Sequence, residues 1–123
     1  MHIAIHPQEV EVFYLLPAIR REFAIALKGD ERSQRDIARL LGVTDAAVSQ
    51  YMSAKRGSPE KSLALPDAIR TAIHNIAPSI TDHHGFVHAA QRILLQAKEE
   101  GFLCRVHEKL SAVPKGCDVC FRK

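Results

Sequence analysis

The chain has 123 residues, of which 46% are hydrophobic and 25% carry charged side chains. This length and composition fit one globular domain, or a small domain with an extension, and exclude a disordered chain. The net charge is only +3, and residues 1–62 hold nine basic and eight acidic side chains. This excess of basic over acidic side chains is too small for a protein that binds nucleic acid non-specifically over its whole surface. Any affinity for DNA therefore has to come from local placement of charge.

Two further features concern the compartment. No apolar run approaches the ~20 residues of a membrane span, and the start MHIAIHPQEV lacks the basic first residues and long apolar core of a signal peptide. We therefore expect a cytoplasmic protein with no membrane contact. Three cysteines in a reducing compartment predict metal or redox chemistry rather than a disulfide framework.

The N-terminal segment predicts helical structure on both sides of Pro17. Proline disfavours a helical conformation in the residue before it, so a kink or a fresh start is expected at Leu16. Residues 17–30 then predict a support helix that ends at Gly29 and Asp30. Its inward side chains are predicted to be Ile19, Phe23 and Leu27, and its outward ones Arg20, Arg21 and Lys28.

Residues 33–57, SQRDIARLLGVTDAAVSQYMSAKRG, predict two short helices joined by a tight turn. Ser33 is a suitable N-cap for a helix to about Leu41, and Thr44 for a second helix from Asp45 to about Ala54. Gly42 fits the left-handed exit between them, because that conformation has no steric cost for glycine. The apolar stripes are Ile37, Leu40 and Leu41 in the first helix and Val48, Tyr51 and Met52 in the second, with Val43 at the corner.

The outer face of the second helix carries short or amide-bearing side chains, which suit base edges in a major groove. Basic residues follow the helix, where phosphate contacts are expected. The predicted DNA-binding residues are Gln34, Arg35, Thr44, Asp45, Ala46, Ser49, Gln50, Ser53, Lys55 and Arg56. Within this set, Ser49 and Gln50 are expected to read bases, and Gln34, Arg35, Lys55 and Arg56 to hold phosphates.

Other interpretations remain open for this segment. Two amphipathic helices joined by glycine also describe an ordinary helical hairpin. Arg32, Arg35 and Arg39 either line the DNA side or form surface ion pairs with Glu22, Glu31 and Asp36, because exposed pairs of this kind are frequent.

The run GVTDAAVSQYMSAKRG, residues 42–57, closely resembles the phage-repressor-like (Xre-type) helix-turn-helix family. With the upstream helix, the resemblance covers about residues 17–57, a third of the chain. The flanks are similar to those of small prokaryotic, especially archaeal-type, regulators whose tails carry cysteines. The resemblance implies a sequence-specific transcription regulator that binds a palindromic double-stranded DNA operator as a homodimer.

After the basic residues Lys55 and Arg56, the sequence predicts a helical tail. Residues 65–77 place Ile69, Ala72, Ile73 and Ile76 on one face of a helix that Pro78 ends. A further helix is expected from Phe86 to about Glu100. With no β-type alternation or repeat anywhere, the predicted fold class is all-α. The predicted division is a DNA-binding domain over residues 1–57 and a helical dimerisation or accessory region over residues 58–123.

The C-terminal residues hold every cysteine and suggest a metal site. Cys104 and His107 are three residues apart, which puts them on one face of a helix, and Cys117 and Cys120 form a C-x-x-C pair after Pro114 and Gly116. Three thiolates and one imidazole make a tetrahedral zinc set, and the same four residues suit an iron-sulfur cluster. General frequency favours zinc, and the choice stays open.

Alternatives remain for these residues too. Cys104 is equally consistent with an apolar packing residue, and His107 with a surface residue near a helix C-terminus. A second group, Asp82, His83, His84 and His88, offers a weaker metal candidate, since clustered histidines at a helix start are more often polar surface.

No catalytic set is recognisable, so we do not expect an enzyme. Two functions compete with the regulator. One is an antitoxin-like module whose tail binds a partner protein while its helix-turn-helix segment binds DNA. The other is a redox enzyme that uses Cys117 and Cys120, although the strand and helix context of a thioredoxin-like site is missing.

Overall fold

The computed structural model describes residues 6–53, 63–110, 117 and 119–121. Within these residues the chain is helical and has no strand, so the predicted all-α fold class is confirmed. In chain order the segments are α1 (Pro7–Val10), the π-helical turn η1 (Glu11–Leu15), α2 (Leu16–Gly29), α3 (Gln34–Leu41), α4 (Asp45–Met52), α5 (Asp67–Ile76), the 3-10 turn η3 (Ala77–Ser79), α6 (His83–Glu99), α7 (Phe102–Leu110) and the 3-10 turn η4 (Val119–Phe121).

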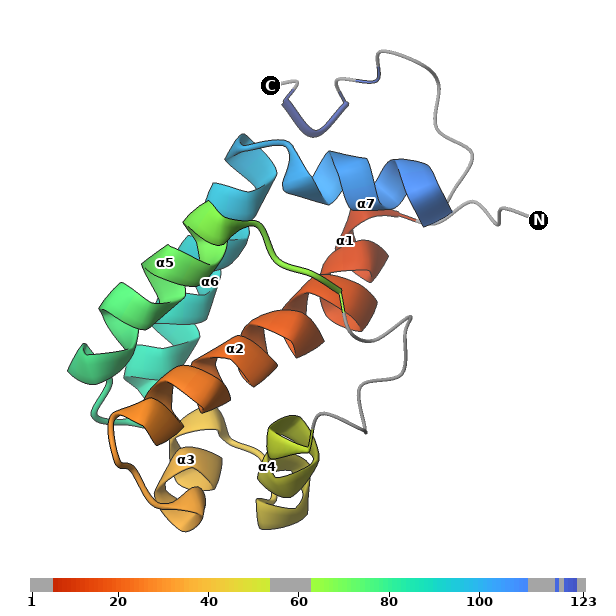
Figure 1. Cartoon of the computed structure of the whole chain (residues 1–123). Helices are drawn as coiled ribbons and strands as arrows, with labels where there is room; N and C mark the ends of the chain where they lie inside the picture. Colours follow the sequence, from red (N-terminus) through yellow and green to blue (C-terminus); the bar gives the residue numbers. More distant parts are fainter. Residues whose placement is uncertain (1–5, 54–62, 111–116, 118, 122–123) are drawn as a thin grey trace.

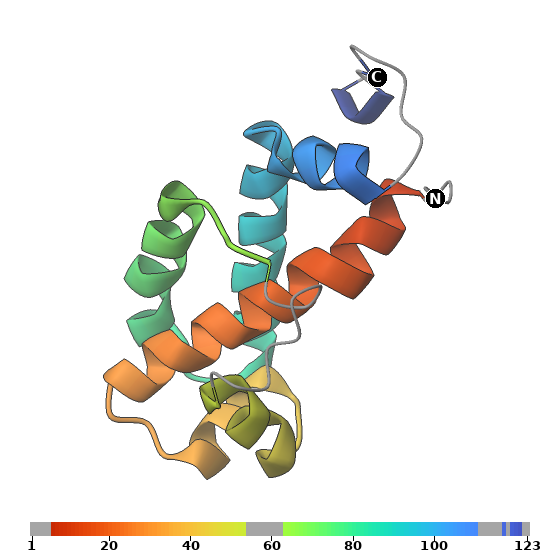
Figure 2. The same cartoon turned by 45° about the vertical axis from the view of Figure 1, so that its right-hand side comes forward.

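The long α2 helix organises these segments. Figures 1 and 2 show α3 and α4 at its C-terminal end, α5 and α6 along one side, and α7 beside α1 at its N-terminal end. Phe23 of α2 and Phe86 of α6 meet edge to face, with ring centroids 5.3 Å apart. The buried side chains form one hydrophobic cluster that draws on α2, α3 and α4 as well as on α5, α6 and α7.

The buried stripe of α2 agrees with its sequence pattern, since Ile19, Phe23 and Leu27 are fully buried. The helix ends at Gly29 with Asp30 as its C-cap, as predicted, and the left-handed residue that follows is Glu31, with φ 62°. One feature differs from expectation. Arg20 and Arg21 are half-buried rather than outward, and the Nε atom of Arg20 has no hydrogen-bond partner among the described residues.

A new helical segment begins at the predicted residue, Leu16, where α2 follows the π-helical turn η1. Leu16 is helical, with φ −61° and ψ −43°, and α1, η1 and α2 follow one another without an interruption. The N–H of Leu16 donates to the Glu11 carbonyl five residues back, which widens the turn ahead of the proline. A wider turn relieves the clash that a proline ring has with the preceding helical turn, so the helix passes through Pro17.

The tail helices follow their predicted patterns with small shifts. Ile69 and Ile73 are fully buried, and Ala72 and Ile76 pack at the edge of the core. The α5 helix ends at Ile76, and Pro78 lies in the 3-10 turn η3 that follows it. The α6 helix begins at His83, earlier than the predicted Phe86, because Asp82 caps it by accepting from the Gly85 N–H at 2.7 Å.

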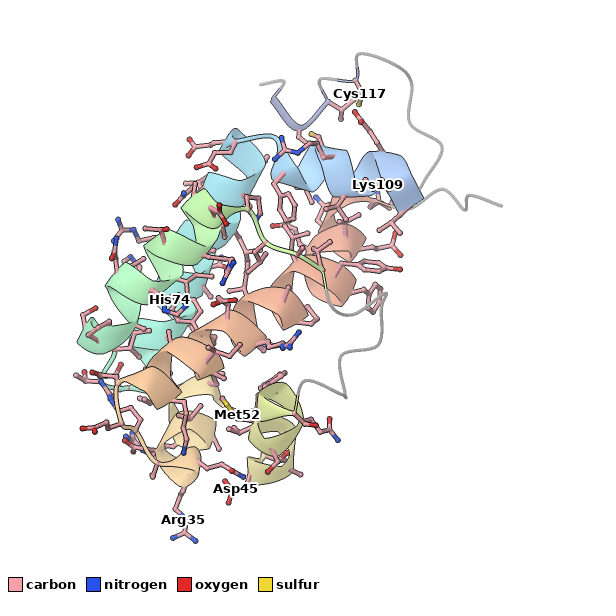
Figure 3. The ribbon with its side chains drawn as sticks, in the orientation of Figure 1. Arg35, Asp45, Met52, His74, Lys109 and Cys117 are labelled. Atoms are coloured by element: carbon pink, nitrogen blue, oxygen red, sulfur yellow. The ribbon has the colours of Figure 1, made fainter. Side chains whose placement is uncertain are left out.

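A polar contact joins α2 to α5 on the outside of the core. Glu22 of α2, whose side chain is 14% exposed, lies 2.6 Å from Nε2 of His74 and 3.7 Å from Nε of Arg70. Figure 3 shows His74 on the side of α5 that faces α2. This contact adds to the apolar packing that holds the two helices together.

The boundary predicted between residues 57 and 58 lies outside the described residues. Among the helices of the described part of the chain, none is long and apolar enough to cross a membrane.

Candidate nucleic-acid interface and thiol cluster

The ends of α3 and α4 are fixed by the residues that the sequence singles out. The Ser33 hydroxyl accepts from the Asp36 N–H at 3.1 Å, and the Thr44 hydroxyl accepts from the Ala47 N–H at 3.1 Å. Gly42 is left-handed, with φ 70° and ψ 36°. Both predicted N-caps and the predicted glycine exit are therefore confirmed, and together they set the angle at which α4 leaves α3.

Gln34 ties the beginning of α3 to α4. Its side-chain amide donates to the Asp45 carbonyl at 3.0 Å and to the Ser49 hydroxyl at 2.6 Å. The sequence predicts a phosphate contact for Gln34, whereas in the structure the amide is engaged within the chain. These two bonds hold Ser49 in a defined orientation on the outer face of α4.

The outer face of α4 is polar and short, and its inner face is apolar. Val48 is fully buried, and Tyr51 and Met52 pack half-buried against the core, as their spacing predicts. Figure 3 shows Met52 on the side of α4 that faces α2, and Asp45 at the start of α4 beside α3. The outward positions are Thr44, Asp45, Ala46, Ser49 and Gln50, all exposed, with Ser53 half-buried at the C-cap.

Positive charge is present next to this face. Arg35, in the first turn of α3, is exposed and points away from the rest of the molecule (Figure 3). The α4 helix ends at Met52, and Ala54, Lys55 and Arg56 lie outside the described residues. Within the described residues, the candidate interface thus consists of the outer face of α4 and the start of α3.

Two of the arginines grouped with Arg35 in the sequence have other contacts. Arg32 donates to the carbonyl oxygens of Pro78 at 3.3 Å and Ile80 at 3.0 Å, so its charge is directed to the corner between α5 and α6. Arg39 forms an ion pair with Asp36 at 2.8 Å on the surface of α3. The interpretation of surface pairing therefore applies to Arg39, and Arg32 connects the segment between α2 and α3 to the tail.

His83 makes a second contact of this kind, which the sequence pattern did not reveal. Its Nδ1 lies 3.0 Å from the Leu40 carbonyl oxygen, and because a carbonyl only accepts, Nδ1 carries the proton. The imidazole covers Gly42, where an added Cβ would lie 2.5 Å from Cε1 of His83. The two residues are far apart in sequence, so no local periodicity relates them.

A cluster of thiols forms at the opposite end of the molecule. Cys104 lies on α7 and Cys120 in η4, and the neighbouring Cys120, Cys117 and Glu108 act on the charge of the Cys104 thiol. Burial, followed by these neighbours, raises the pKa of the Cys104 thiol. A raised pKa keeps this sulfur protonated and weakly nucleophilic near neutral pH.

The C-x-x-C spacing pairs Cys117 with Cys120, and both of these residues act on the charge of Cys104. All three cysteines are half-buried free thiols. His107 is also half-buried, on α7 three residues beyond Cys104. Across residues 6–53, 63–110, 117 and 119–121, no three His, Cys, Asp or Glu side chains form a ready ligand group for a metal ion. The thiols are gathered without being arranged around one point.

The second predicted histidine group has structural contacts instead. Asp82 caps α6 and His83 contacts the Leu40 carbonyl, which leaves His84 and His88 as exposed side chains of α6.

No protein-family model, curated protein or solved structure matches the chain.

Proposed function

We propose that the chain is a sequence-specific DNA-binding regulator of transcription that acts in the cytoplasm. The observation that carries the proposal is the outer face of α4, where exposed short and amide side chains stand on a helix whose other face is buried. A surface of this kind can approach base edges closely, because no long side chain keeps the helix backbone away from them. The resemblance of residues 42–57 to Xre-type readers supports the same conclusion.

In this proposal α4 enters the major groove. Gln50 is the residue best suited to read a base, since an amide side chain can form two hydrogen bonds with adenine. Ser49 is held beside it by Gln34, at 2.6 Å, so its hydroxyl is presented in one orientation. Arg35 contacts a phosphate near the N-terminus of α3, where the free backbone N–H groups also favour an anion.

The proposed active form is a homodimer on a palindromic operator. The net charge of +3 provides little non-specific attraction, so two readers on one operator are needed to gain affinity. Readers of this type place their recognition helices about 34 Å apart, one turn of DNA. The helical tail is the part of the chain proposed to set that distance.

The test is selection of a binding sequence from random double-stranded DNA, followed by affinity measurements on the selected site. Gln50→Ala is expected to weaken binding by about 1–3 kcal/mol, roughly 5- to 150-fold in Kd, and to relax the preference at one base pair of each half-site. Binding to unrelated DNA should change little, because phosphate contacts remain.

Gln91→Ala is the matched control, since Gln91 is an exposed glutamine of α6, away from α4. It should bind the selected site like the unmodified protein. A folded Gln50→Ala variant with unchanged site preference would refute this placement of the reading face. Failure to select any DNA sequence, together with co-purification of a second small protein, would favour the antitoxin-like module.

A further inference from the structure

We infer that a cavity between α2, α5 and residues 63–66, which lead into α5, binds a small organic anion. The ligand is a carboxylate with a short aliphatic or aromatic body. The cavity has a volume of about 310 Å³, at the lower end of the range for small-molecule sites. The inference does not depend on the proposed DNA binding, because it is tested on the protein without DNA.

The cavity lies where three segments of the chain meet. Side chains of α2 line one wall, residues 63–65 line the second, and Arg70 of α5 lines the third. Figures 1 and 2 show the segment before α5 running from α2 to the start of α5. A bound molecule would therefore contact both the tail and α2, the helix that packs against α3 and α4.

Positive charge exceeds negative charge around the cavity. Among the described residues that line it, Arg21 and Arg70 are cationic and Glu22 is anionic, which leaves one net positive charge. The Glu22 carboxylate lies 2.6 Å from Nε2 of His74 and 3.7 Å from Nε of Arg70. Because these neighbours already engage Glu22, its charge opposes an anionic ligand less than that of an unpaired carboxylate.

Arg21 is the cation that a ligand would neutralise. Its side chain is half-buried, and within the described residues it makes no hydrogen bond or ion pair. By contrast, Arg32 donates to two carbonyl oxygens and Arg39 pairs with Asp36. A carboxylate can accept two N–H bonds from one guanidinium, so Arg21 is suited to hold the head of such a ligand.

The rest of the wall is apolar, which favours an organic anion over an inorganic one. Leu63 and Leu65 pack half-buried at the edge of the hydrophobic core, and Ala18 lines the cavity with them. Ile25 borders the same space and is 39% exposed, although its side chain is large and aliphatic. An aliphatic or aromatic body would remove this surface from water, whereas inorganic phosphate has no part that could do so.

The test is a titration of the isotope-labelled full chain with sodium octanoate and sodium benzoate, followed by proton-nitrogen NMR and calorimetry. Octanoate is expected to bind at a single site with a Kd between about 10 µM and 1 mM, as for other ligands of its size. The largest shift changes should fall on Arg21, Ile25 and residues 63–65. Octanol, the uncharged analogue, and inorganic phosphate should each bind at least about tenfold more weakly.

Arg21→Gln tests the role of charge at unchanged fold. The variant should fold normally, because the Arg21 side chain makes no bond within the described residues, and should bind octanoate at least about tenfold more weakly. Ile25→Ser should weaken octanoate binding at least about threefold by removing apolar wall. Arg92→Gln is the matched control, since Arg92 is an exposed arginine of α6 that does not line the cavity, and it should bind like the unmodified protein.

Several results would overturn the inference. These are a spectrum that neither octanoate nor benzoate changes, octanol or phosphate that binds as tightly as octanoate, or an Arg21→Gln variant that binds octanoate like Arg92→Gln. Shift changes centred on the exposed Val12 and Phe13 would also overturn it, because they would place the ligand on η1. The comparison of octanoate with octanol uses the unmodified protein, so it decides the question even where a variant does not fold.

Discussion

Arg32 lies between α2 and α3, where its guanidinium donates to the carbonyl oxygens of Pro78 and Ile80 and pairs with Asp30 at 3.3 Å. Its side chain is 20% exposed, whereas the side chain of Arg39, which pairs with Asp36, is 59% exposed. Two arginines with similar sequence surroundings therefore differ in their expected contribution to stability. A charged donor to partly buried carbonyls is worth more than an ion pair in water.

Arg32→Ala is expected to lower the free energy of unfolding by about 1–3 kcal/mol, because the Ile80 carbonyl loses its charged donor. Arg39→Ala, the matched control, is expected to change it by less than about 1 kcal/mol. Urea denaturation followed by circular dichroism measures both variants. Equal losses would mean that the contact between Arg32 and the tail contributes nothing beyond a surface pair.

At the scale of the elements, the turn between α3 and α4 is set by Gly42 and by the ring that covers it. Gly42 has a φ of 70°, and Cε1 of His83 occupies the space next to its Cα. The same ring donates to the Leu40 carbonyl, in the last turn of α3. The direction of α4 thus depends on α6 as well as on the turn itself.

Gly42→Ala is expected to destabilise the protein by at least about 1–2 kcal/mol, the cost of a left-handed conformation for a residue with a Cβ. The displaced imidazole adds the loss of its hydrogen bond to Leu40. Gly29→Ala is the control, since a Cβ there meets no atom within 4 Å, and it should be neutral or stabilising by up to about 1 kcal/mol. Thermal unfolding compares the two, and a Gly42→Ala variant as stable as the unmodified protein would contradict this account.

At the scale of the whole molecule, one hydrophobic cluster extends from the α3 and α4 end to α7. Phe23 of α2 contacts Phe86 of α6, and Ile69 and Ile73 of α5 are fully buried in the same cluster. The division into residues 1–57 and 58–123 remains a prediction, and the core suggests how it can be tested. Removing the tail would expose apolar side chains that each contribute about 1.5–3 kcal/mol when buried.

A fragment of residues 1–62 is therefore expected not to fold by itself, because the lost burial is comparable with the roughly 5–15 kcal/mol stability of a typical domain. Circular dichroism and proton-nitrogen NMR of the fragment should show no cooperative melting and little signal dispersion, whereas the full chain should melt in one transition. A fragment that melts cooperatively would support two independent domains instead.

Much of the local structure followed from the sequence alone. Caps, the glycine exit and apolar spacing depend on neighbours within one turn of helix, so Ser33, Gly42, Thr44 and the stripe around Val48 were predictable from their residue types. The candidate metal donors also followed from residue type, although their binding awaits measurement. The exposed outer face of α4 followed from the sequence once the buried stripe was known.

Other features depended on contacts between distant residues. Gln34 bonds to α4, and His83 covers Gly42. The continuous helical conformation on both sides of Pro17 likewise depends on the π-helical turn η1, which the periodicity of apolar residues in the sequence does not predict. Residue type fixes what a side chain can bind and which helix face it occupies, whereas its actual partner is set by how the helices pack, and only the tertiary structure determines that packing.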